Sequence, residues 1–354
     1  MMLPASDRGW HGLWSRGGSL RWLAPLAALF AVLARRRQRR HRDGLDGAWR
    51  ATVPVIVVGN ISVGGTGKTP MVIWLLAYLQ RKGWRPGVVS RGYGGRRRIE
   101  PLRVTAASDP RQCGDEPLLI ARRSGVPVVV AKDRVAAVRR LLTEGVNIVV
   151  SDDGLQHYRL ARDLEVVMID GRRGHGNGRC LPAGPLREPP DRLASADLTV
   201  VTGDGSVGFG HLGDHRMALQ VRGILAPGNA IRQGLEGLPM GPIHAVAGIG
   251  DPEQFPITTD APRDPMARLG CELVRHPYPD HHVLRWQDLD FDDPGPIVMT
   301  EKDMMRCLPD FTIWPAALRQ RCLAAVVDAV PDPAFESALN EVMAAKGCVQ
   351  EHRA

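Results

Sequence analysis

The sequence lacks the patterns that hold structural metals or build a disulfide framework. Its six cysteines are widely scattered, with no Cys-x-x-Cys pair and no ligand-like spacing of His and Cys. Cysteines distributed in this way are typical of reduced thiols in a cytosolic chain. We therefore expect neither disulfides nor a structural zinc site.

Net positive charge is small over most of the chain. The net charge is +8, but residues 1–50 hold ten arginines against three aspartates and so carry +7 of it. The rest of the chain is nearly neutral and shows no basic face, so a nucleic-acid partner is not expected. Lysine is rare as well, with five among 46 basic residues, so each lysine stands out.

No apolar run is long enough to cross a membrane. Residues 22–34 form a thirteen-residue apolar run that leads directly into the arginine-rich residues 35–42. A spanning helix needs about 20 apolar residues, and a signal peptide carries its charges before the apolar core. Two interpretations remain: a buried core helix with a solvated arginine tail, or a monotopic anchor whose arginines meet anionic head groups.

Three tryptophans favour the anchor, because indole rings prefer the membrane interface. They are Trp10, Trp14 and Trp22. We expect peripheral or monotopic attachment to the anionic cytoplasmic face of the inner membrane.

From residue 53 the sequence alternates apolar β runs with helical patterns. Strands are expected at 53–58, 87–90, 127–131, 146–151 and 164–169, and helices at 68–82, 116–124 and 134–144. Continuous apolar runs indicate strands that are buried on both faces, so the pattern predicts an α/β fold with a doubly wound, mostly parallel sheet of the P-loop NTPase type.

A second, smaller α/β domain is expected to follow the first. Further strands are predicted at 198–201, 243–247, 297–300 and 323–330, and a last helix at 333–346. The expected units are a membrane-associating segment, a kinase core, the smaller domain and a C-terminal helix that packs back on the core. Their boundaries are 1–50, 51–197, 198–330 and 331–354.

A phosphate-binding loop follows the first expected strand. Its residues are Gly64, Gly65, Thr66, Gly67, Lys68 and Thr69. Backbone N–H groups of such a loop and the following helix N-terminus form an anion site. Lys68 would reach the β- and γ-phosphates of ATP, and the Thr69 hydroxyl would ligate Mg²⁺. The match departs from the strict pattern at Ser62, where a glycine is usual.

Two consecutive carboxylates directly follow the strand expected at 146–151. They are Asp152 and Asp153. An acidic residue at this end of a parallel strand beside the loop is where P-loop enzymes place the group that organises the metal. Alone the pair would fit a turn or a helix cap equally well, but next to a P-loop it favours a metal site.

Several ordered motifs resemble one family, the tetraacyldisaccharide 4′-kinases of lipid A biosynthesis. They are NISVGGTGKTP, SRGYGG, GDEP, DDGLQH, GNGRCLPAGPLREP, AVAGIG, DHH and TEKD, spread in order over about 250 residues. The resemblance implies transfer of the γ-phosphate of ATP to the 4′-hydroxyl of an acylated glucosamine disaccharide 1-phosphate. The implied partners are this glycolipid and the membrane surface, and a monomer is expected.

The resemblance also gives roles to matched residues. Asp115 of GDEP resembles the catalytic carboxylate of the family, with His281 or His282 beside it. Asp152, Asp153 and His157 would organise Mg²⁺ and the phosphates. The remaining matched residues would lie near the phosphates or the acceptor sugar, or contribute active-site charges of unassigned role: Ser90, Arg91, Tyr93, Arg187 and Glu188.

Two other classes of protein compete with a kinase. A nucleotide-switched ATPase or GTPase with a protein partner would also carry a P-loop, but related switches have a second lysine at the position of Val63, and no Asn-Lys-x-Asp motif is present. A non-enzymatic membrane scaffold leaves the P-loop unexplained. A kinase is therefore the preferred interpretation.

Overall fold

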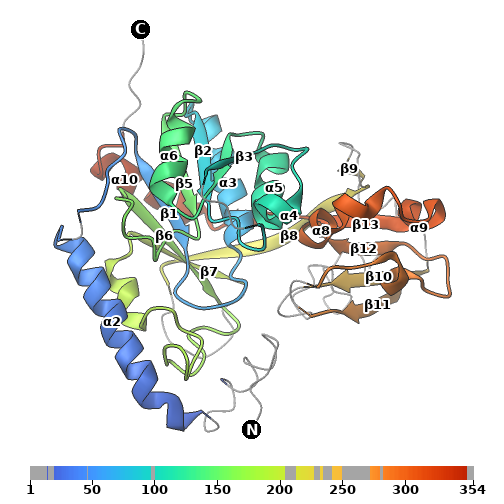
Figure 1. The fold of residues 1–354 in the computed structure, drawn as a ribbon, viewed down its shortest axis with the longest axis horizontal. Helices are drawn as coiled ribbons and strands as arrows, with labels where there is room; N and C mark the ends of the chain where they lie inside the picture. The colour runs from blue at the N-terminus through green and yellow to red at the C-terminus, as the bar shows by residue number, and fades with distance from the viewer. Residues whose placement is uncertain are drawn as a thin grey trace.

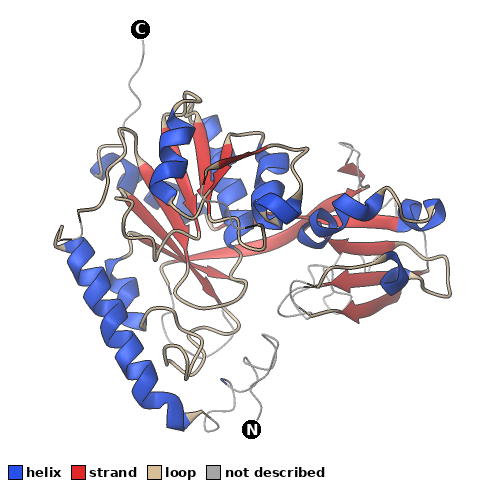
Figure 2. Ribbon diagram, in the orientation of Figure 1, coloured by secondary structure: helices blue, strands red, loops and turns tan. Residues whose placement is uncertain are grey.

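A single sheet runs through the whole protein (Figure 1). The computed structural model describes residues 14, 20–45, 47–96, 100–203, 213–226, 232–233, 241–248, 272–279 and 282–348. Within these residues the sheet has 13 strands, in the order β11-β10-β12-β13-β8-β7-β6-β1-β5-β2-β4-β3, with β9 paired to β8. Figure 2 shows helices on both faces of its first half. The predicted α/β class with a mostly parallel sheet is confirmed.

The first half of the sheet consists of parallel strands with one antiparallel strand, β3, at the edge. Its strands are β1 (Val55–Gly59), β2 (Pro86–Ser90), β3 (Leu102–Val104), β4 (Val128–Val130), β5 (Ile148–Asp152), β6 (Leu164–Asp170) and β7 (Leu198–Thr202). Most are β-branched apolar runs that are buried along their whole length, as strands covered on both faces should be.

Helices cover both faces of this half. They are α3 (Lys68–Arg81), α4 (Pro110–Cys113), α5 (Asp115–Ser124) and α6 (Arg134–Leu142), with the 3₁₀ segment η2 (Pro190–Ser195) after β6. Side chains of α3 and α5 share a core with the Ile56 and Val58 face of β1, whereas α6 packs with the Val55 and Val57 face. The sheet is therefore doubly wound, with the carboxyl ends of β1, β2 and β5 at one edge.

The second half of the sheet is joined to the first by one long antiparallel pair, β8 (His215–Leu225) and β13 (Cys322–Pro331). β8 also continues the first half, because its start pairs with β7. The remaining elements are β9 (Arg232–Gln233), β10 (Pro242–Ala247), β11 (Glu272–Pro277), η5 (Trp286–Leu289), β12 (Ile297–Thr300), α8 (Glu301–Phe311) and α9 (Ala316–Arg321). Figure 1 shows β8 running from one half to the other.

Two features of this half bear on the sequence predictions. β8 and β11 were not predicted, because both are partly exposed and carry polar side chains instead of a continuous apolar run. Leu198, where we expected the second α/β set to begin, starts a strand that pairs with β6 in the first half.

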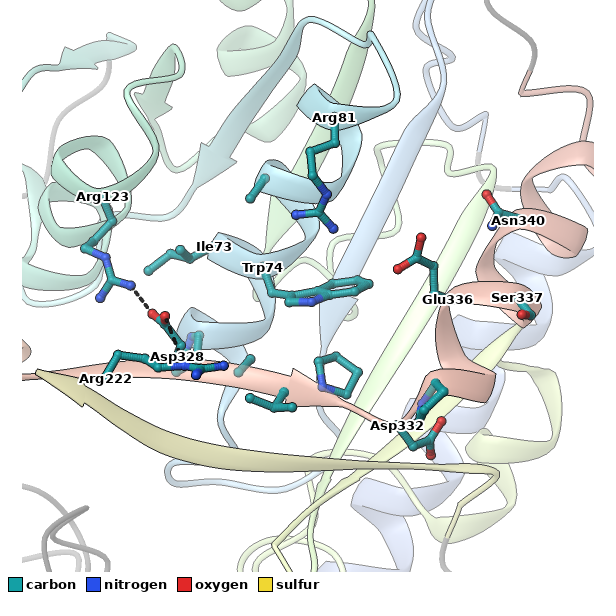
Figure 3. A pocket seen from close by; sticks show the side chains of 16 residues that line it. Ile73, Trp74, Arg81, Arg123, Arg222, Asp328, Asp332, Glu336, Ser337 and Asn340 are labelled. Atoms are coloured by element: carbon teal, nitrogen blue, oxygen red, sulfur yellow. Dashed lines mark hydrogen bonds and ion pairs between the residues drawn. The ribbon is translucent and has the colours of Figure 1, made fainter. Parts of the chain in front are cut away.

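The last helix, α10 (Pro333–Ala345), returns to the first half of the protein. Phe335 and Leu339 are fully buried in the core that contains α3, and Tyr78 is hydrogen-bonded to Asn340. A cavity of about 670 Å³ lies between α3, β13 and α10 (Figure 3). Trp74 lies in it, with its ring centroid 5.4 Å from Tyr78 and 5.5 Å from Phe335.

The N-terminal helix lies along the outside of the first half (Figure 1). A short 3₁₀ segment, η1 (Arg21–Leu23), leads into α2 (Ala24–Arg42), so the arginine run is helical as well. One side of α2 is held by Ala27 in a small apolar cluster and by Arg35, which donates to Asp191 at 2.8 Å. The helix is 19 residues long. Of the described helices, none has the length and apolarity to cross a bilayer.

The other side of α2 carries apolar side chains that no described residue covers. Leu26, Leu29, Val32 and Leu33 are each more than half exposed, and Trp22 is 66% exposed. The interpretation of this segment as a buried core helix is therefore wrong. Trp14 is also not an interface residue in this structure, because it is buried and donates to the Pro182 carbonyl at 3.2 Å. Trp10 lies outside the described residues.

Candidate active site

The glycine loop is fixed by hydrogen bonds to its carbonyl groups. The Arg173 guanidinium donates to the Gly65 carbonyl at 2.7 Å, and the Thr202 hydroxyl donates to the Thr66 carbonyl at 2.9 Å. In a planar trans peptide the N–H points opposite to the C=O. The next amides, those of Thr66 and Gly67, therefore point away from these partners. Such an arrangement suits an anion.

Gly67 is the left-handed residue that starts α3, with φ of 76°. This backbone conformation favours a glycine, and a Cβ at this position would also make tight contacts of 3.0 Å with Met217 Cε and Thr202 Oγ1. The P-loop prediction thus agrees with the local geometry. Thr69 follows Lys68 in the first turn of α3.

Lys68 and Arg187 converge on one carboxylate, that of Asp153. The Lys68 Nζ lies 3.7 Å from Asp153 Oδ1, and the Arg187 Nη1 lies 3.1 Å from Asp153 Oδ2. Burial acts to raise the pKa of Asp153, but the charges of Lys68 and Arg187 outweigh it and hold the pKa below its usual range. Asp153 has φ of 48°, which is uncommon for a residue other than glycine. The site therefore contains strained backbone where the charges meet.

Asp152 is buried, and the charge of Lys68 lowers its pKa by less than its surroundings raise it. The Ser90 hydroxyl donates to its Oδ2 at 3.0 Å. Burial, followed by the negative charges of Glu116 and Asp153, raises the pKa of Asp152 to about 7. A cluster of carboxylates with too little positive charge is stabilised by a bound cation.

These residues fit Mg²⁺ bound together with phosphates. Among the described residues, no group of three or more His, Cys, Asp or Glu side chains is arranged to hold a metal. Mg²⁺ usually keeps several waters and takes one or two protein carboxylates plus phosphate oxygens. Asp152 and Asp153 supply two such carboxylates in one cavity. The Thr69 hydroxyl stays a predicted ligand.

Asp115 and Glu116 begin α5, and both are paired with cations of α8. Asp115 Oδ2 lies 2.6 Å from the Arg306 Nε, and Glu116 Oε1 lies 2.9 Å from the Lys302 Nζ. Burial alone would raise the pKa of Glu116, but the ammonium groups of Lys302 and Lys68 outweigh it and lower the pKa. Asp115, the carboxylate predicted to be catalytic, thus lies beside Glu116, whose charge interacts with both Lys302 and the P-loop residue Lys68.

Sequence reasoning missed Glu116, Lys302 and Arg306 as site residues. Glu116 follows Asp115 in GDEP, and Lys302 is one of only five lysines, so both carried a signal. Arg306 carried none, because arginine is abundant in this chain. It is fixed by the buried Asp303 at 2.9 Å and by the Gly248 carbonyl at 3.0 Å.

The histidine expected beside Asp115 is not defined by the structure. His281 lies outside the described residues. His282 is described, and its Nε2 lies 3.3 Å from Asp288 Oδ2 while its ring stacks on Tyr278. His282 is therefore engaged within its own segment, which leaves His281 as the candidate partner of Asp115.

Glu188 is held in a network of side chains beside the site, whereas the Nε2 of His157 is buried with no hydrogen-bond partner among the described residues. His157 does not line the cavities given for this structure. Burial, together with the charge of Arg134, lowers the pKa of the His157 imidazole to about 4. Glu188 accepts from the Tyr158 hydroxyl at 3.0 Å and pairs with Arg192 at 2.9 Å.

A cavity of about 480 Å³ connects α2 with the charged residues. Phe30, Leu33, Ala34 and Arg37 of α2 form one wall. The other residues are mostly polar: Ser90, Arg91, Tyr93, Glu116, Asp152, Asp153, Gln156, Tyr158, Arg187 and Glu188. Seven of the sequence-predicted residues thus line one cavity: Ser90, Arg91, Tyr93, Asp152, Asp153, Arg187 and Glu188.

The sequence matches one family along most of its length. The sequence model of the tetraacyldisaccharide-1-P 4′-kinase family covers residues 19–344. The chain belongs to this family. The resemblance inferred from the motifs is confirmed, and the protein is a kinase.

Relatives and a solved structure agree with this assignment. The chain is 49% identical to the tetraacyldisaccharide 4′-kinase of Alkalilimnicola ehrlichii, over 91% of this chain and 92% of that protein. It is 46% identical to the enzyme of the same name from Azotobacter vinelandii, with the same coverage. The crystal structure of LpxK from Aquifex aeolicus in complex with ATP matches with a TM-score of 0.73 and 25% identity, over 91% of this chain and 99% of that chain.

Proposed function

We propose that this kinase transfers the γ-phosphate of ATP to the 4′-hydroxyl of a tetraacylated glucosamine disaccharide 1-phosphate at the cytoplasmic face of the inner membrane. The observation that carries the proposal is the cavity between α2 and the acidic cluster. One wall is mostly apolar and belongs to a helix with an uncovered apolar side, and the other carries Glu116, Asp152 and Asp153. An acceptor with a sugar head and acyl chains needs both.

The nucleotide would bind to the loop from Gly64 to Thr69, with Lys68 against the β- and γ-phosphates. Mg²⁺ would be held by the Thr69 hydroxyl and by Asp152 and Asp153, and would neutralise charge on the transferring phosphoryl group. The positive charge of a bound cation would also offset the burial and the neighbouring carboxylates that raise the pKa of Asp152.

Asp115 would accept the proton of the acceptor hydroxyl. The 4′ oxygen forms the new bond to the γ-phosphorus, the bond from that phosphorus to the β,γ-bridging oxygen breaks, and ADP leaves with the electron pair. In the structure Asp115 Oδ2 is paired with Arg306, and Oδ1 accepts a hydrogen bond from the Glu116 amide. His281, if it approaches on closure of the two halves, would orient the carboxylate.

Attachment to the membrane would be through α2. Its uncovered leucines would enter the acyl boundary, and the arginine-rich turns would meet anionic head groups. The glycolipid could then enter the cavity along α2 without leaving the lipid phase, because Phe30 and Leu33 line the cavity from that side.

The test is a transfer assay. The protein is incubated with γ-labelled ATP, Mg²⁺ and the tetraacylated disaccharide 1-phosphate in mixed micelles, and the position of the label is determined. We expect label at the 4′ position and none on an acceptor that lacks the 4′-hydroxyl. ATP hydrolysis without acceptor labelling would instead support the nucleotide-switch alternative.

A further inference from the structure

A buried arginine connects the N-terminal helix with the cavity at the reaction site. It is Arg192 of the 3₁₀ segment η2, and 2% of its surface is exposed. Its Nε lies 2.9 Å from Glu188 Oε2, and its Nη2 lies 2.6 Å from Glu165 Oε2. Glu188 lines the cavity, whereas Arg192 and Glu165 do not. Arg192 therefore holds a carboxylate of the cavity wall from behind.

The Glu188 carboxylate is fixed by a second contact, with Tyr158. The Tyr158 hydroxyl donates to Glu188 Oε2 at 3.0 Å, which is the same oxygen that faces Arg192. Neither contact occupies the other oxygen, Oε1. Tyr158 and Glu188 line the same cavity as Phe30 and Leu33 of α2. A carboxylate oxygen in this position can accept a hydrogen bond from a sugar hydroxyl.

Ser195, the last residue of η2, joins Arg192 to α2. The Arg192 Nη1 donates to the Ser195 hydroxyl oxygen at 2.8 Å, and this hydroxyl donates to the Arg192 carbonyl at 2.8 Å. The Gln38 side chain of α2 donates to the same hydroxyl oxygen at 2.8 Å. A hydroxyl group has one donor and two acceptor sites, so all three are used here. A continuous series of contacts thus runs from Gln38 through Ser195 and Arg192 to Glu188.

Two more side chains of α2 hold the helix on this part of the protein. Arg35 donates to Asp191 of η2 at 2.8 Å, and the centroid of the His41 ring lies 5.1 Å from that of Tyr158. Arg35, Gln38 and His41 are three positions apart, so they are neighbours on the surface of the helix. One side of α2 is therefore attached to η2 and to the cavity wall.

The guanidinium of Arg192 suits a role in fixing geometry. Each of its three nitrogens faces a different partner: Nε faces Glu188, Nη1 faces Ser195, and Nη2 faces Glu165. A guanidinium presents its donors in a rigid, planar fork, so the position of one partner constrains the others. A lysine has one ammonium group on a flexible stem and would not constrain them in this way.

We infer that Arg192 is a positioning residue that sets the Glu188 carboxylate relative to α2, and this inference rests on the function proposed above. The proposed acceptor has acyl chains and a sugar head, and the cavity has a mostly apolar wall on α2 and a polar wall that includes Glu188. The two parts of one acceptor fit both walls only at one spacing of the walls. Contacts that fix this spacing before binding lower the cost of reaching the reacting geometry.

The test is a double-variant cycle in the transfer assay with the tetraacylated disaccharide 1-phosphate. Ser195→Ala removes the hydroxyl that joins Arg192 to α2, and Glu188→Gln removes the carboxylate. We expect Ser195→Ala alone to lower kcat/KM for the acceptor roughly tenfold and to leave the KM for ATP unchanged. In the Glu188→Gln background the same substitution should cost less than about twofold, because the two residues act through one series of contacts. Gln38→Ala should behave like Ser195→Ala.

A merely structural role would not depend on Glu188 in this way. If Glu188→Gln has no turnover, the cycle is measured in the dissociation constant of the acceptor without ATP, with the same expectations. Arg192→Lys keeps the charge but loses the fork, and should lower kcat/KM at least as much as Ser195→Ala does. Urea titration checks that each variant is folded. Ser195 is an exposed residue, so Ser195→Ala tests the inference even where Arg192→Lys does not fold.

The controls separate positioning from local packing and from membrane binding. Thr143→Ala is the matched substitution, because the Thr143 hydroxyl accepts from Arg140 and donates to the Arg140 carbonyl, both at 2.8 Å, just after α6. It should leave kcat/KM unchanged. Ser195→Thr keeps the hydroxyl and should retain most of the wild-type kcat/KM. Gln38→Ala and Ser195→Ala should co-sediment with anionic vesicles as the wild type does.

Three outcomes would overturn the inference. Equal losses from Ser195→Ala with and without the Glu188 carboxylate would show that the hydroxyl does not act through Glu188. No loss from either Ser195→Ala or Gln38→Ala would show that the contact with α2 does not position the site. A loss of vesicle binding as large as the loss of activity would assign these contacts to anchoring. If the wild type labels no acceptor, the proposed function itself fails, which is a distinct result.

Discussion

Asp115 and Arg306 form a buried ion pair 2.6 Å long between α5 and α8. The same guanidinium lies 2.9 Å from Asp303, which has no exposed surface. Arg306 therefore compensates the charge of two carboxylates, those of Asp303 and of the proposed catalytic base Asp115. The relationship bears on both the stability and the reactivity of this site.

Replacing Arg306 should destabilise the fold strongly. Arg306→Ala leaves Asp115 and Asp303 buried without their cation, and removal of one partner of a buried pair typically costs about 3–5 kcal/mol. The loss is measured as the difference in the free energy of unfolding between the wild type and the variant, from urea titration. Arg50→Ala is the matched control, because Arg50 forms an equally short pair with Asp163 but is 66% exposed, and should cost less than about 1 kcal/mol. Similar losses in the two variants would contradict this account.

Asp115 and His281 should act as one unit in catalysis. Asp115→Ala and His281→Ala should each lower kcat and leave the KM for ATP within a few-fold. Residues that act together are non-additive, so the double variant should be much less impaired than the product of the single losses. Steady-state kinetics of the four proteins measure the coupling. Fully multiplicative losses would show that the two residues work independently.

Lys68→Ala should lower kcat by at least about a hundredfold. In the proposed function the Lys68 ammonium would contact the phosphates where charge develops, and a positioned charge of this kind typically contributes several kcal/mol. Lys82→Ala changes a lysine just after the end of the same helix and should keep turnover near that of the wild type. Near-normal turnover of the Lys68 variant would remove the phosphate-binding role from this loop.

Substitutions that introduce negative charge on the uncovered side of α2 should release the protein from membranes. Leu26 and Leu29 are each more than half exposed and lie outside the cavity lining. Burial of one leucine contributes about 1.5–3 kcal/mol, so the double variant Leu26→Glu/Leu29→Glu should bind vesicles at least a hundredfold more weakly. Co-sedimentation with vesicles that contain anionic lipid measures this.

Ile313→Glu is the control for that experiment. Ile313 is 79% exposed but lies after α8 in the second half, so its substitution should not change vesicle binding. High salt should release less wild-type protein than the leucine substitutions do, because salt screens the arginines but not the apolar contact. A wild type that stays wholly in the supernatant would exclude α2 as an anchor.

Stability should fall in acid partly because of His157. Its pKa is lowered to about 4 in the folded protein, by burial and by the charge of Arg134, from an ordinary value of 6.5. The unfolded chain therefore binds a proton more readily than the folded one between these values, so stability is lost as the pH falls from about 6.5 toward 4. His157→Gln should lose less stability over this range. Urea titrations at pH 7 and pH 5 compare the two proteins, and equal losses would contradict the assignment.

The sequence by itself determined the elements whose signals are local. β1 and β5 are continuous apolar β-branched runs, and that pattern is unambiguous when a strand is buried on both faces. The glycine loop was found because its chemistry depends on consecutive residues. Asp152 and Asp153 were found because the end of β5 is itself a local feature.

Only the tertiary structure decided which distant residues meet. Asp115 and Arg306 are 191 positions apart, and the local sequence around each residue does not indicate that the two will pair. β8 joins the two halves, but its alternating exposure hides it from a search for apolar runs. The uncovered side of α2 could not be told from a core helix either, since the composition of a helix does not say what packs on it. Local order is set by neighbouring residues, whereas charge pairing and burial depend on where the fold brings remote segments together.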